Sequence, residues 1–239
     1  MKKNLLVGLV LFVAGSLLAA DSSPKDEVTA AADALGKAPS YSWRTTSENA
    51  SGGFRRGPTE GKTEKGGCTA LSMTFGDNTT ELVIQGTNAA IKTADNGWQS
   101  SAEILKDDSG GGFNRTVFMV RMAQNFKAPA AEAANLASET KELKSGADGI
   151  SGDLTEDGAK GLLTFRGRGN GDGPSVSNAK GSVTFWITDG KLVKYQTHVT
   201  GTVSFNGNDR DVDRTTTTEI KDVGTTKMEV PDDAKKKLE

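Results

Sequence analysis

The fifty residues from Gly181 to Val230 constrain the fold of this chain more than any other stretch. Apolar and polar residues alternate along it, and the dipeptides Asp189-Gly190 and Asn206-Gly207 interrupt the alternation. A period of two is typical of strands with one buried face. Asp-Gly and Asn-Gly favour tight turns between antiparallel strands. The stretch therefore predicts three consecutive antiparallel strands, a β-meander.

The apolar residues of this meander also predict how its strands are aligned. The long second strand presents one set on a single face: Val193, Tyr195, Val199, Val203 and Phe205. The first strand presents another: Val183, Phe185 and Ile187. A three-residue loop, Thr188 to Gly190, puts both sets on the same face, whereas a two-residue loop separates them. We therefore predict the three-residue loop, with Gly190 in the left-handed region that glycine tolerates.

An even-length loop at the second turn brings Val212 and Ile220 to the same side, so we expect one continuous apolar face across three strands. The rest of the chain predicts a short helix, an earlier meander and two central helices before the last strands. The predicted ranges are Pro24–Lys37 (helix), Tyr41–Trp98 (meander, with Thr59–Lys65 as an edge strand), Asn114–Phe126 and 129–145 (helices) and Lys160–Arg166 (strand). No linker separates these parts. We expect one α+β domain, in which the helices cover one face of a large antiparallel sheet.

The N-terminus has the pattern of a secretory signal peptide. Lys2 and Lys3 precede an apolar run, Leu5–Leu18, which ends in Ala19-Ala20. The run is shorter than the ~20 residues that span a bilayer. We predict cleavage after Ala20, which divides the chain into a signal peptide, residues 1–20, and a single domain, residues 21–239. This predicts a periplasmic or extracellular protein with no transmembrane segment after cleavage, and no Cys follows the apolar run to carry a lipid anchor.

Charge and composition exclude several functional classes. Removing Lys2 and Lys3 from the 29 basic residues leaves 27 against 31 acidic residues, a net charge of −4. A nucleic-acid-binding protein needs a basic surface, so we expect no nucleic-acid partner. A single cysteine, Cys68, rules out an internal disulfide. It is interpreted as a small buried apolar residue, with a reactive thiol, or a dyad with His198, as the alternative.

We expect neither a metal, nor a cofactor, nor an enzymatic activity. His198 is the only histidine, and no cluster of His, Cys or Asp has the spacing of metal ligands. No G-x-S-x-G sequence is present to carry a nucleophile. The glycine-rich stretch Arg166–Gly173 lacks the G-x-G-x-x-G pattern of a dinucleotide site. Carboxylate pairs of the glycosidase kind are not visible in a sequence, because their members are far apart in the chain.

The first central helix carries the best candidate for a binding surface. Phe118, Met122 and Phe126 recur at four-residue spacing, and Met119 lies beside them. One interpretation is a helix that completes the core. The other is a lid whose Met and Phe side chains line a cavity for an acyl chain. In that case the helix lies over the meander face, and the candidate ligand-binding residues are Phe118, Met119, Met122, Phe126, Phe185, Tyr195, Val199, Val203 and Phe205.

The order of elements, the turn Asp95-Asn96-Gly97-Trp98 and the ending from Asp222 to Lys235 resemble the periplasmic lipoprotein-carrier superfamily, which includes LolA-like carriers and LppX/LprG-like lipid binders. The resemblance implies an unclosed β-barrel, with helices over its opening and an apolar cavity for lipid. It implies an exported carrier of a lipid or acyl chain, with an envelope protein as a possible partner. The alternative is a non-catalytic structural or envelope-assembly module with a filled core.

Overall fold

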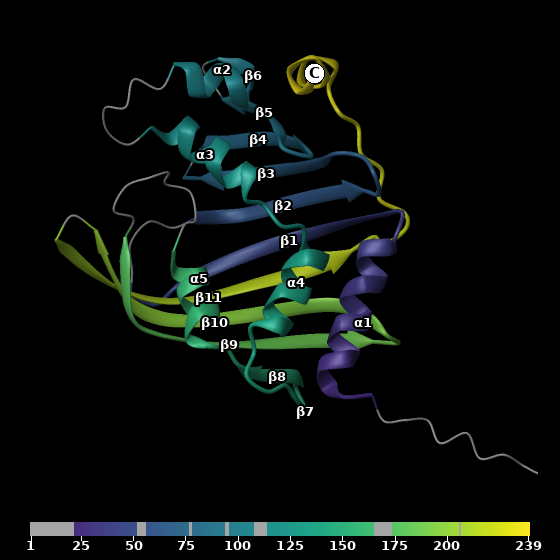
Figure 1. Ribbon diagram of the computed structural model, residues 1–239. Helices are drawn as coiled ribbons and strands as arrows, with labels where there is room; N and C mark the ends of the chain where they lie inside the picture. The colour runs from purple at the N-terminus through teal and green to yellow at the C-terminus, as the bar shows by residue number, and fades with distance from the viewer. Residues whose placement is uncertain are drawn as a thin grey trace, which may run out of the picture.

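The computed structural model describes residues 22–51, 56–76, 78–93, 96–107, 114–164, 174–205 and 207–239, and the predicted signal peptide, residues 1–20, lies outside them. Eleven antiparallel strands form one sheet, in the order β6-β5-β4-β3-β2-β1-β11-β10-β9-β8-β7 (Figure 1). The two ends of this order are β6 and β7, which do not pair, so the sheet is not closed. The predicted fold, a large antiparallel sheet in an unclosed barrel, is confirmed. The strands are β1 (Ser40–Asn49), β2 (Arg56–Glu64), β3 (Thr69–Phe75), β4 (Asn78–Gln85), β5 (Asn88–Thr93), β6 (Gly97–Ser100), β7 (Lys144–Gly146), β8 (Gly149–Asp153), β9 (Ser175–Thr188), β10 (Lys191–Phe205) and β11 (Asn208–Lys221).

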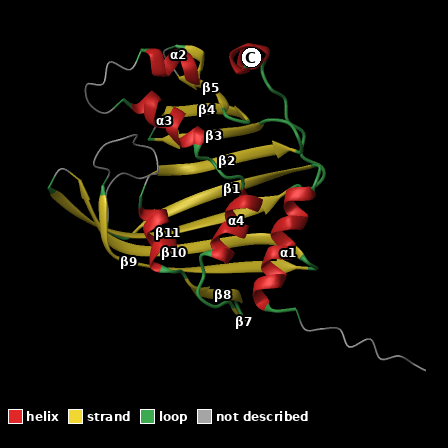
Figure 2. Ribbon diagram, in the orientation of Figure 1, coloured by secondary structure: helices red, strands yellow, loops and turns green. Residues whose placement is uncertain are grey.

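Helices cover one face of this sheet, which we call the inner face (Figure 2). The inner face is lined by one continuous core that reaches from β5 to β9 and includes Ile91, Trp43 and Phe185, all buried. The helices are α1 (Pro24–Lys37), α2 (Ser101–Lys106), α3 (Arg115–Gln124), α4 (Pro129–Ser138), α5 (Glu156–Leu163) and α6 (Asp232–Leu238).

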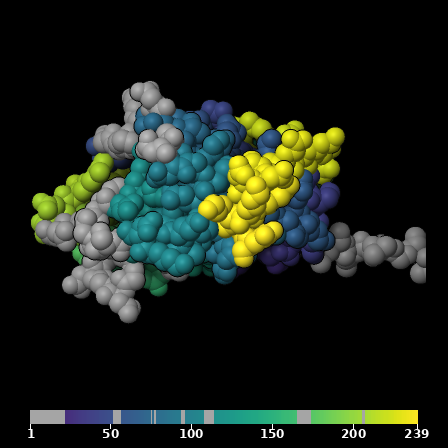
Figure 3. Space-filling model, turned by 90° about the horizontal axis from the view of Figure 1, so that it is seen from above, coloured from purple at the N-terminus to yellow at the C-terminus, as the bar shows by residue number. Residues whose placement is uncertain are grey.

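The C-terminal helix α6 lies on the opposite, outer face at one end of the sheet. Val83 of β4 and Ala90 of β5 point away from the main core and are covered by Ala234 and Leu238 of α6. Figure 3 shows the C-terminal segment lying against this part of the chain. Helix α6 therefore closes a second, smaller core.

The hairpin between β9 and β10 differs from its prediction. Thr188 pairs with Lys191, so the loop has two residues, Asp189 and Gly190, whose φ angles are 50° and 71°. Two successive positive φ angles are typical of the type I′ turn, whose twist matches that of paired strands. The prediction of positive φ at Gly190 is confirmed, and the three-residue loop is wrong.

A β-bulge after this turn restores the alignment that the sequence favours. The ladder shifts between Leu192 and Lys194, so that Tyr195 lies opposite Phe185 and the two share one face, as the sequence predicts. Leu192 is 2% exposed and Val193 38% exposed. Val193 was therefore assigned to the wrong face, because a bulge moves one residue out of the alternation.

Three further element predictions are wrong. β2, the predicted edge strand, pairs with both β1 and β3 near the middle of the sheet. The predicted second central helix ends at Ser138, and the next residues form β7 and β8. The first half of the predicted strand 160–166 belongs to helix α5. Thr155 caps this helix by accepting a hydrogen bond from the Gly158 amide at 3.1 Å, and acidic residues occupy its first turn.

The type I′ turn predicts a cost for any side chain at Gly190. A Cβ there would have no atom within 4 Å, so the cost arises from the backbone alone. We expect Gly190→Val to lower the free energy of unfolding by about 1 kcal/mol or more, measured by urea denaturation. In the control Gly67→Ala the added carbon makes only ordinary contacts, at 3.5 Å or more, so we expect a change within about 0.5 kcal/mol. Equal stability of the parent and Gly190→Val proteins would contradict the turn assignment.

Candidate ligand-binding site

The helices of the inner face form two groups that stand on the two sides of the sheet. α2 and α3 pack on β5 at one side, whereas α1, with α4 against it, and α5 pack on β9 and β10 at the other. Between them lie the central strands β1, β2, β3 and β11. Within the described part of the chain, the extensive helix–strand backbone contacts involve the outer strands and not these four. The two helix groups therefore lie to either side of the middle of the sheet, and the segment that joins α3 to α4 crosses it (Figure 1).

The middle of the inner face is more polar than the sequence predicts. Thr45 and Ser47 of β1 hydrogen-bond across to Thr218 and Thr216 of β11, at 2.9 and 3.1 Å. Arg214 is the next inward-facing residue of β11. Thr45, Ser47, Arg214 and Thr216 are all partly exposed, although they lie on the covered face. The expected continuous apolar face is therefore wrong in β11, where only the flanking Val212 and Ile220 are apolar.

Trp43 connects the central strands to the helices. Its indole lies across β2 at Gly61, where a Cβ would fall 2.1 Å from two ring atoms. The other side of the indole stacks on Phe126, just beyond the end of α3, with ring centroids 6.1 Å apart and planes 17° apart. Tyr41 lies beside it, 5.6 Å away. Trp43 is 3% exposed, so this stack belongs to the core beneath the helices.

The structure divides the predicted ligand-binding residues into two sets. Phe118, Met119 and Met122 are on α3, which packs on the β5 side of the sheet. Phe185, Tyr195, Val199 and Val203 are on β9 and β10, beneath the other helix group. The predicted position of α3 directly above this second set is therefore wrong. The side chain of Phe205 lies outside the described part, although its backbone pairs with Asn208.

Burial separates core residues from surface-lining residues within both sets. Met119, Phe185, Tyr195 and Val199 are at most 2% exposed and belong to the core. The remaining four pack against the core but keep part of their surface exposed: Phe118, Met122, Phe126 and Val203. Other partly buried apolar residues, which were not among the predicted ligand-binding residues, also pack against the core, among them Leu162, Val176 and Val212. Partly exposed apolar groups thus lie on both sides of the polar central strip.

A partly buried glutamate links α4 to the sheet. The hydroxyl of Tyr195 donates to Oε2 of Glu132 at 2.5 Å. Tyr195 is 2% exposed, so the oxygen that it contacts is inside the protein. Burial raises the pKa of Glu132 above its usual 4.5, although the hydrogen bond from Tyr195 and the charge of Lys127 act in the opposite direction. Burial also raises the pKa of Tyr195, and Glu132 adds to this effect.

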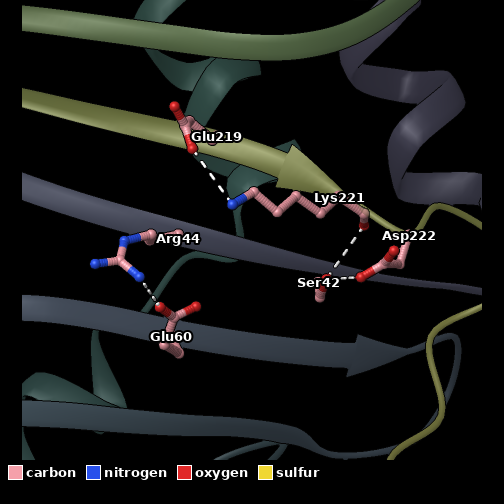
Figure 4. Close-up of polar contacts among 6 residues, drawn as sticks. All are labelled: Ser42, Arg44, Glu60, Glu219, Lys221 and Asp222. Carbon is pink, nitrogen blue, oxygen red and sulfur yellow. Dashed lines mark hydrogen bonds and ion pairs between the residues drawn. The ribbon is translucent and has the colours of Figure 1, made fainter.

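The outer face of the central strands is charged and open to solvent. Figure 4 shows Arg44 paired with Glu60 at 2.7 Å, Lys221 paired with Glu219 at 3.4 Å, and Ser42 donating to Asp222 at 2.9 Å. These pairs are mostly exposed, so each contributes little to stability. Their position shows that the two faces of β1, β2 and β11 differ sharply in environment.

A recess of about 560 Å³ lies across the outer ends of β9, β10 and β11. Most of the residues that line it are of polar type, including Lys180, Thr200 and Asp211. It does not lie between the helices and the sheet, where the sequence predicts the cavity. Nearby, His198 lies 2.9 Å from Asp213, a partner that the sequence analysis did not identify. Hydroxyls of β10 donate hydrogen bonds to the neighbouring carboxylates of β11, as Thr202 does to Asp211 at 2.8 Å.

The described residues contain no group of three or more His, Cys, Asp and Glu side chains able to hold a metal ion.

Cys68 packs against the small core beneath α6 and is partly buried. Burial raises the pKa of its thiol, and the charge of Glu64 raises it further. Since the thiolate is the reactive form, this environment favours the interpretation of Cys68 as an unreactive apolar residue.

Two solved structures are similar to this chain. The crystal structure of LprF from Mycobacterium bovis has a TM-score of 0.48 and 11% identity, over 89% of this chain and 100% of that chain. The crystal structure of the LolA superfamily protein NE2245 from Nitrosomonas europaea has a TM-score of 0.33 and 8% identity, over 88% of this chain and 96% of that chain. No family model matches the sequence, and no curated protein matches it. Among the helices that the structure describes, none has the length and apolar character needed to cross a membrane.

The close contact between Trp43 and Gly61 predicts a site where one methyl group disturbs the central strands. We expect Gly61→Ala to lower the free energy of unfolding by about 1–3 kcal/mol, because the indole must leave its position. Near-ultraviolet circular dichroism should change together with the urea midpoint. In the control Gly36→Ala the added Cβ lies 3.6 Å from that of Ala130, so stability should hold or rise slightly. Equal effects of the two substitutions would contradict the contact.

The Glu132–Tyr195 pair predicts a dependence of stability on pH. Between the usual pKa of Glu132 and its raised value, the folded protein holds a proton that the unfolded chain releases, so stability falls as pH rises through this range. Each unit of the shift corresponds to about 1.4 kcal/mol. Glu132→Gln keeps an oxygen that accepts from Tyr195 but carries no charge.

We therefore expect Glu132→Gln to be more stable than the parent at neutral pH, and the difference to disappear below about pH 4, where both side chains are neutral. Urea denaturation at several pH values measures this difference. Tyr195→Phe is the matched control. It removes the hydroxyl that donates to Glu132, so we expect it to lower the free energy of unfolding by about 1–3 kcal/mol, whereas Glu132→Gln raises it. A parent that gains stability over Glu132→Gln as pH rises would contradict the assignment.

Proposed function

We propose that this protein is an exported carrier that holds a lipid or another apolar ligand on the inner face of its half-barrel, between the two helix groups. The observation that supports this proposal best is the straddling of the central strands. Helices pack on the outer strands, and the middle of the covered face keeps partial exposure at Thr45, Ser47 and Arg214.

The partly exposed apolar side chains support an apolar ligand. Phe118, Met122 and Phe126 come from the α3 side, and Leu162 and Val203 from the α5 side. Each covers core residues yet retains surface that a ligand would bury, at about 25 cal/mol per Å². Met side chains adapt to ligands of irregular shape.

The N-terminal sequence supports a place of action outside the cytoplasm. Lys2, Lys3 and the apolar run Leu5–Leu18 have the pattern of a secretory signal peptide. An exported carrier has to receive and release its ligand, so a second envelope component, a donor or an acceptor, belongs to the proposal. The role proposed is binding and transfer, without a chemical reaction on the ligand.

The experiment is to block the inner face and compare it with the same change on the outer face. Ser47 and Thr46 are neighbours on β1, and Ser47 points inward whereas Thr46 is exposed on the outer face. We expect Ser47→Trp to occupy the space between the helix groups and to reduce binding of a fluorescent fatty acid about tenfold or more. Thr46→Trp should bind like the parent protein.

Native mass spectrometry of the gently purified parent protein gives the second measurement. We expect adducts with the masses of lipids, and their loss in Ser47→Trp but not in Thr46→Trp. A parent protein that carries no apolar adduct and binds no fatty acid would overturn the carrier proposal and favour a structural module with a filled core. Equal binding by the two tryptophan variants would place the ligand elsewhere on the protein.

A further inference from the structure

Arg214 is a positively charged residue on the inner face of the half-barrel. It lies in the middle of β11, opposite Val199 of β10 and Asn49 of β1. Its neighbours on the same face of β11 are Val212 and Thr216. Arg214 therefore lies between apolar Val212 and the hydroxyl row formed by Thr216, Ser47, Thr218 and Thr45.

The surroundings satisfy this guanidinium only in part. It donates to the carbonyl oxygen of Leu162 at 2.5 Å, near the C-terminal end of α5. A guanidinium has five N–H donors. Among the described residues no carboxylate lies within ion-pair distance of Arg214, while burial lowers the pKa of its side chain. A partly buried cation without an anionic partner is unfavourable, and an anion from outside the chain would relieve this cost.

One explanation is purely structural. A cation at the C-terminus of a helix is favourable, and Arg214 anchors α5 to the sheet through Leu162. This explanation accounts for one N–H donor. It does not account for the partly exposed hydroxyl row that continues from Arg214 across β11 and β1, next to partly exposed apolar residues.

We propose that Arg214 binds the anionic headgroup of an amphiphilic ligand, a carboxylate or a phosphate, whose apolar chain lies along the partly exposed apolar side chains of the inner face. The inference rests on the proposed carrier function and adds the class of ligand. The planar guanidinium pairs with two oxygens of a carboxylate or phosphate in parallel hydrogen bonds. Thr216 is the next inward-facing residue of β11, and its hydrogen bond with Ser47 leaves one of the two hydroxyl hydrogens to donate to the headgroup.

The apolar part of the ligand has two groups of side chains available. Val176, Val203 and Val212 lie on the sheet on one side of Arg214, with Leu162 on α5. Phe118, Met122 and Phe126 lie on the far side of the hydroxyl row. The charged headgroup binds at the boundary, where it keeps the hydrogen bonds that it would lose on a wholly apolar face.

The test compares two ligands that differ only in the headgroup. Hexadecanoic acid and hexadecanol have the same chain, and competition against a fluorescent fatty alcohol measures the dissociation constant of each at neutral pH. We expect the parent protein to bind the acid about tenfold or more tightly than the alcohol, the usual size of a charge-assisted hydrogen bond. In Arg214→Gln we expect this preference to disappear while the alcohol binds as before.

Arg44→Gln is the matched control, since it removes the same charge from the outer face of neighbouring β1 and should keep the preference. Arg214→Lys keeps a cation that can donate to Leu162, so it tests the role of the planar fork if Arg214→Gln fails to fold. We expect Arg214→Lys to retain part of the preference. A third ligand, inorganic phosphate, tests whether the site takes a free anion.

The outcomes separate this inference from the carrier function. Equal binding of acid and alcohol by the parent overturns the role of Arg214 but leaves the carrier standing. An equal loss of both ligands in Arg214→Gln, with a lower melting temperature, shows that Arg214 only anchors α5. Displacement of the fatty acid by phosphate at similar concentration shows a site for a free anion and overturns the amphiphile. Failure of the parent to bind either ligand overturns the carrier as well.

Discussion

The stack of Gly61, Trp43 and Phe126 is the contact on which the arrangement of the inner face depends. The helix contacts on the inner face concentrate at β5, β9 and β10, to either side of the central strands. On the central strands, the indole of Trp43 can lie across β2 because Gly61 has no side chain. Phe126 then ties the end of α3 to the same ring. One absent methyl group thus sets how close the two layers come at this point.

The sequence predicts most of the sheet, because each strand of an antiparallel sheet records its own exposure in an alternation of period two. It does not predict a bulge, since Leu192 and Val193 are both apolar and either suits the buried face. The sequence also does not predict the order of the strands in the sheet. β2 reads as a polar edge strand, yet it pairs on both sides, because its inward residues Thr59, Gly61 and Thr63 leave room for large neighbours. Helix α5 was missed because its two leucines match a short strand as well as a helix.

The sequence predicts the type of side chain at the candidate site but not how the elements that carry these side chains are arranged. The four-residue spacing of Phe118, Met122 and Phe126 correctly indicates a helix with an apolar stripe, but no local pattern says which strands that stripe faces. α3 packs on β5 rather than β10 because the chain passes directly from β6 through α2 into it. The polar character of the inner strip was visible in the sequence. In β11, alternate residues point to the same face, so Arg214, Thr216 and Thr218 lie on the face of Val212 and Ile220.

That strip bears on the choice between a carrier and a filled structural core. A core gains stability from apolar burial, and every buried polar group has to find a partner within it. The hydroxyls of Thr45 and Thr218 satisfy each other, as do those of Ser47 and Thr216, so the strip costs little when empty. Arg214 is different, since the carbonyl oxygen of Leu162, its hydrogen-bond partner among the described residues, does not balance its charge. A structural module has no need of a cation on its covered face, whereas a carrier whose ligand brings an anionic group does.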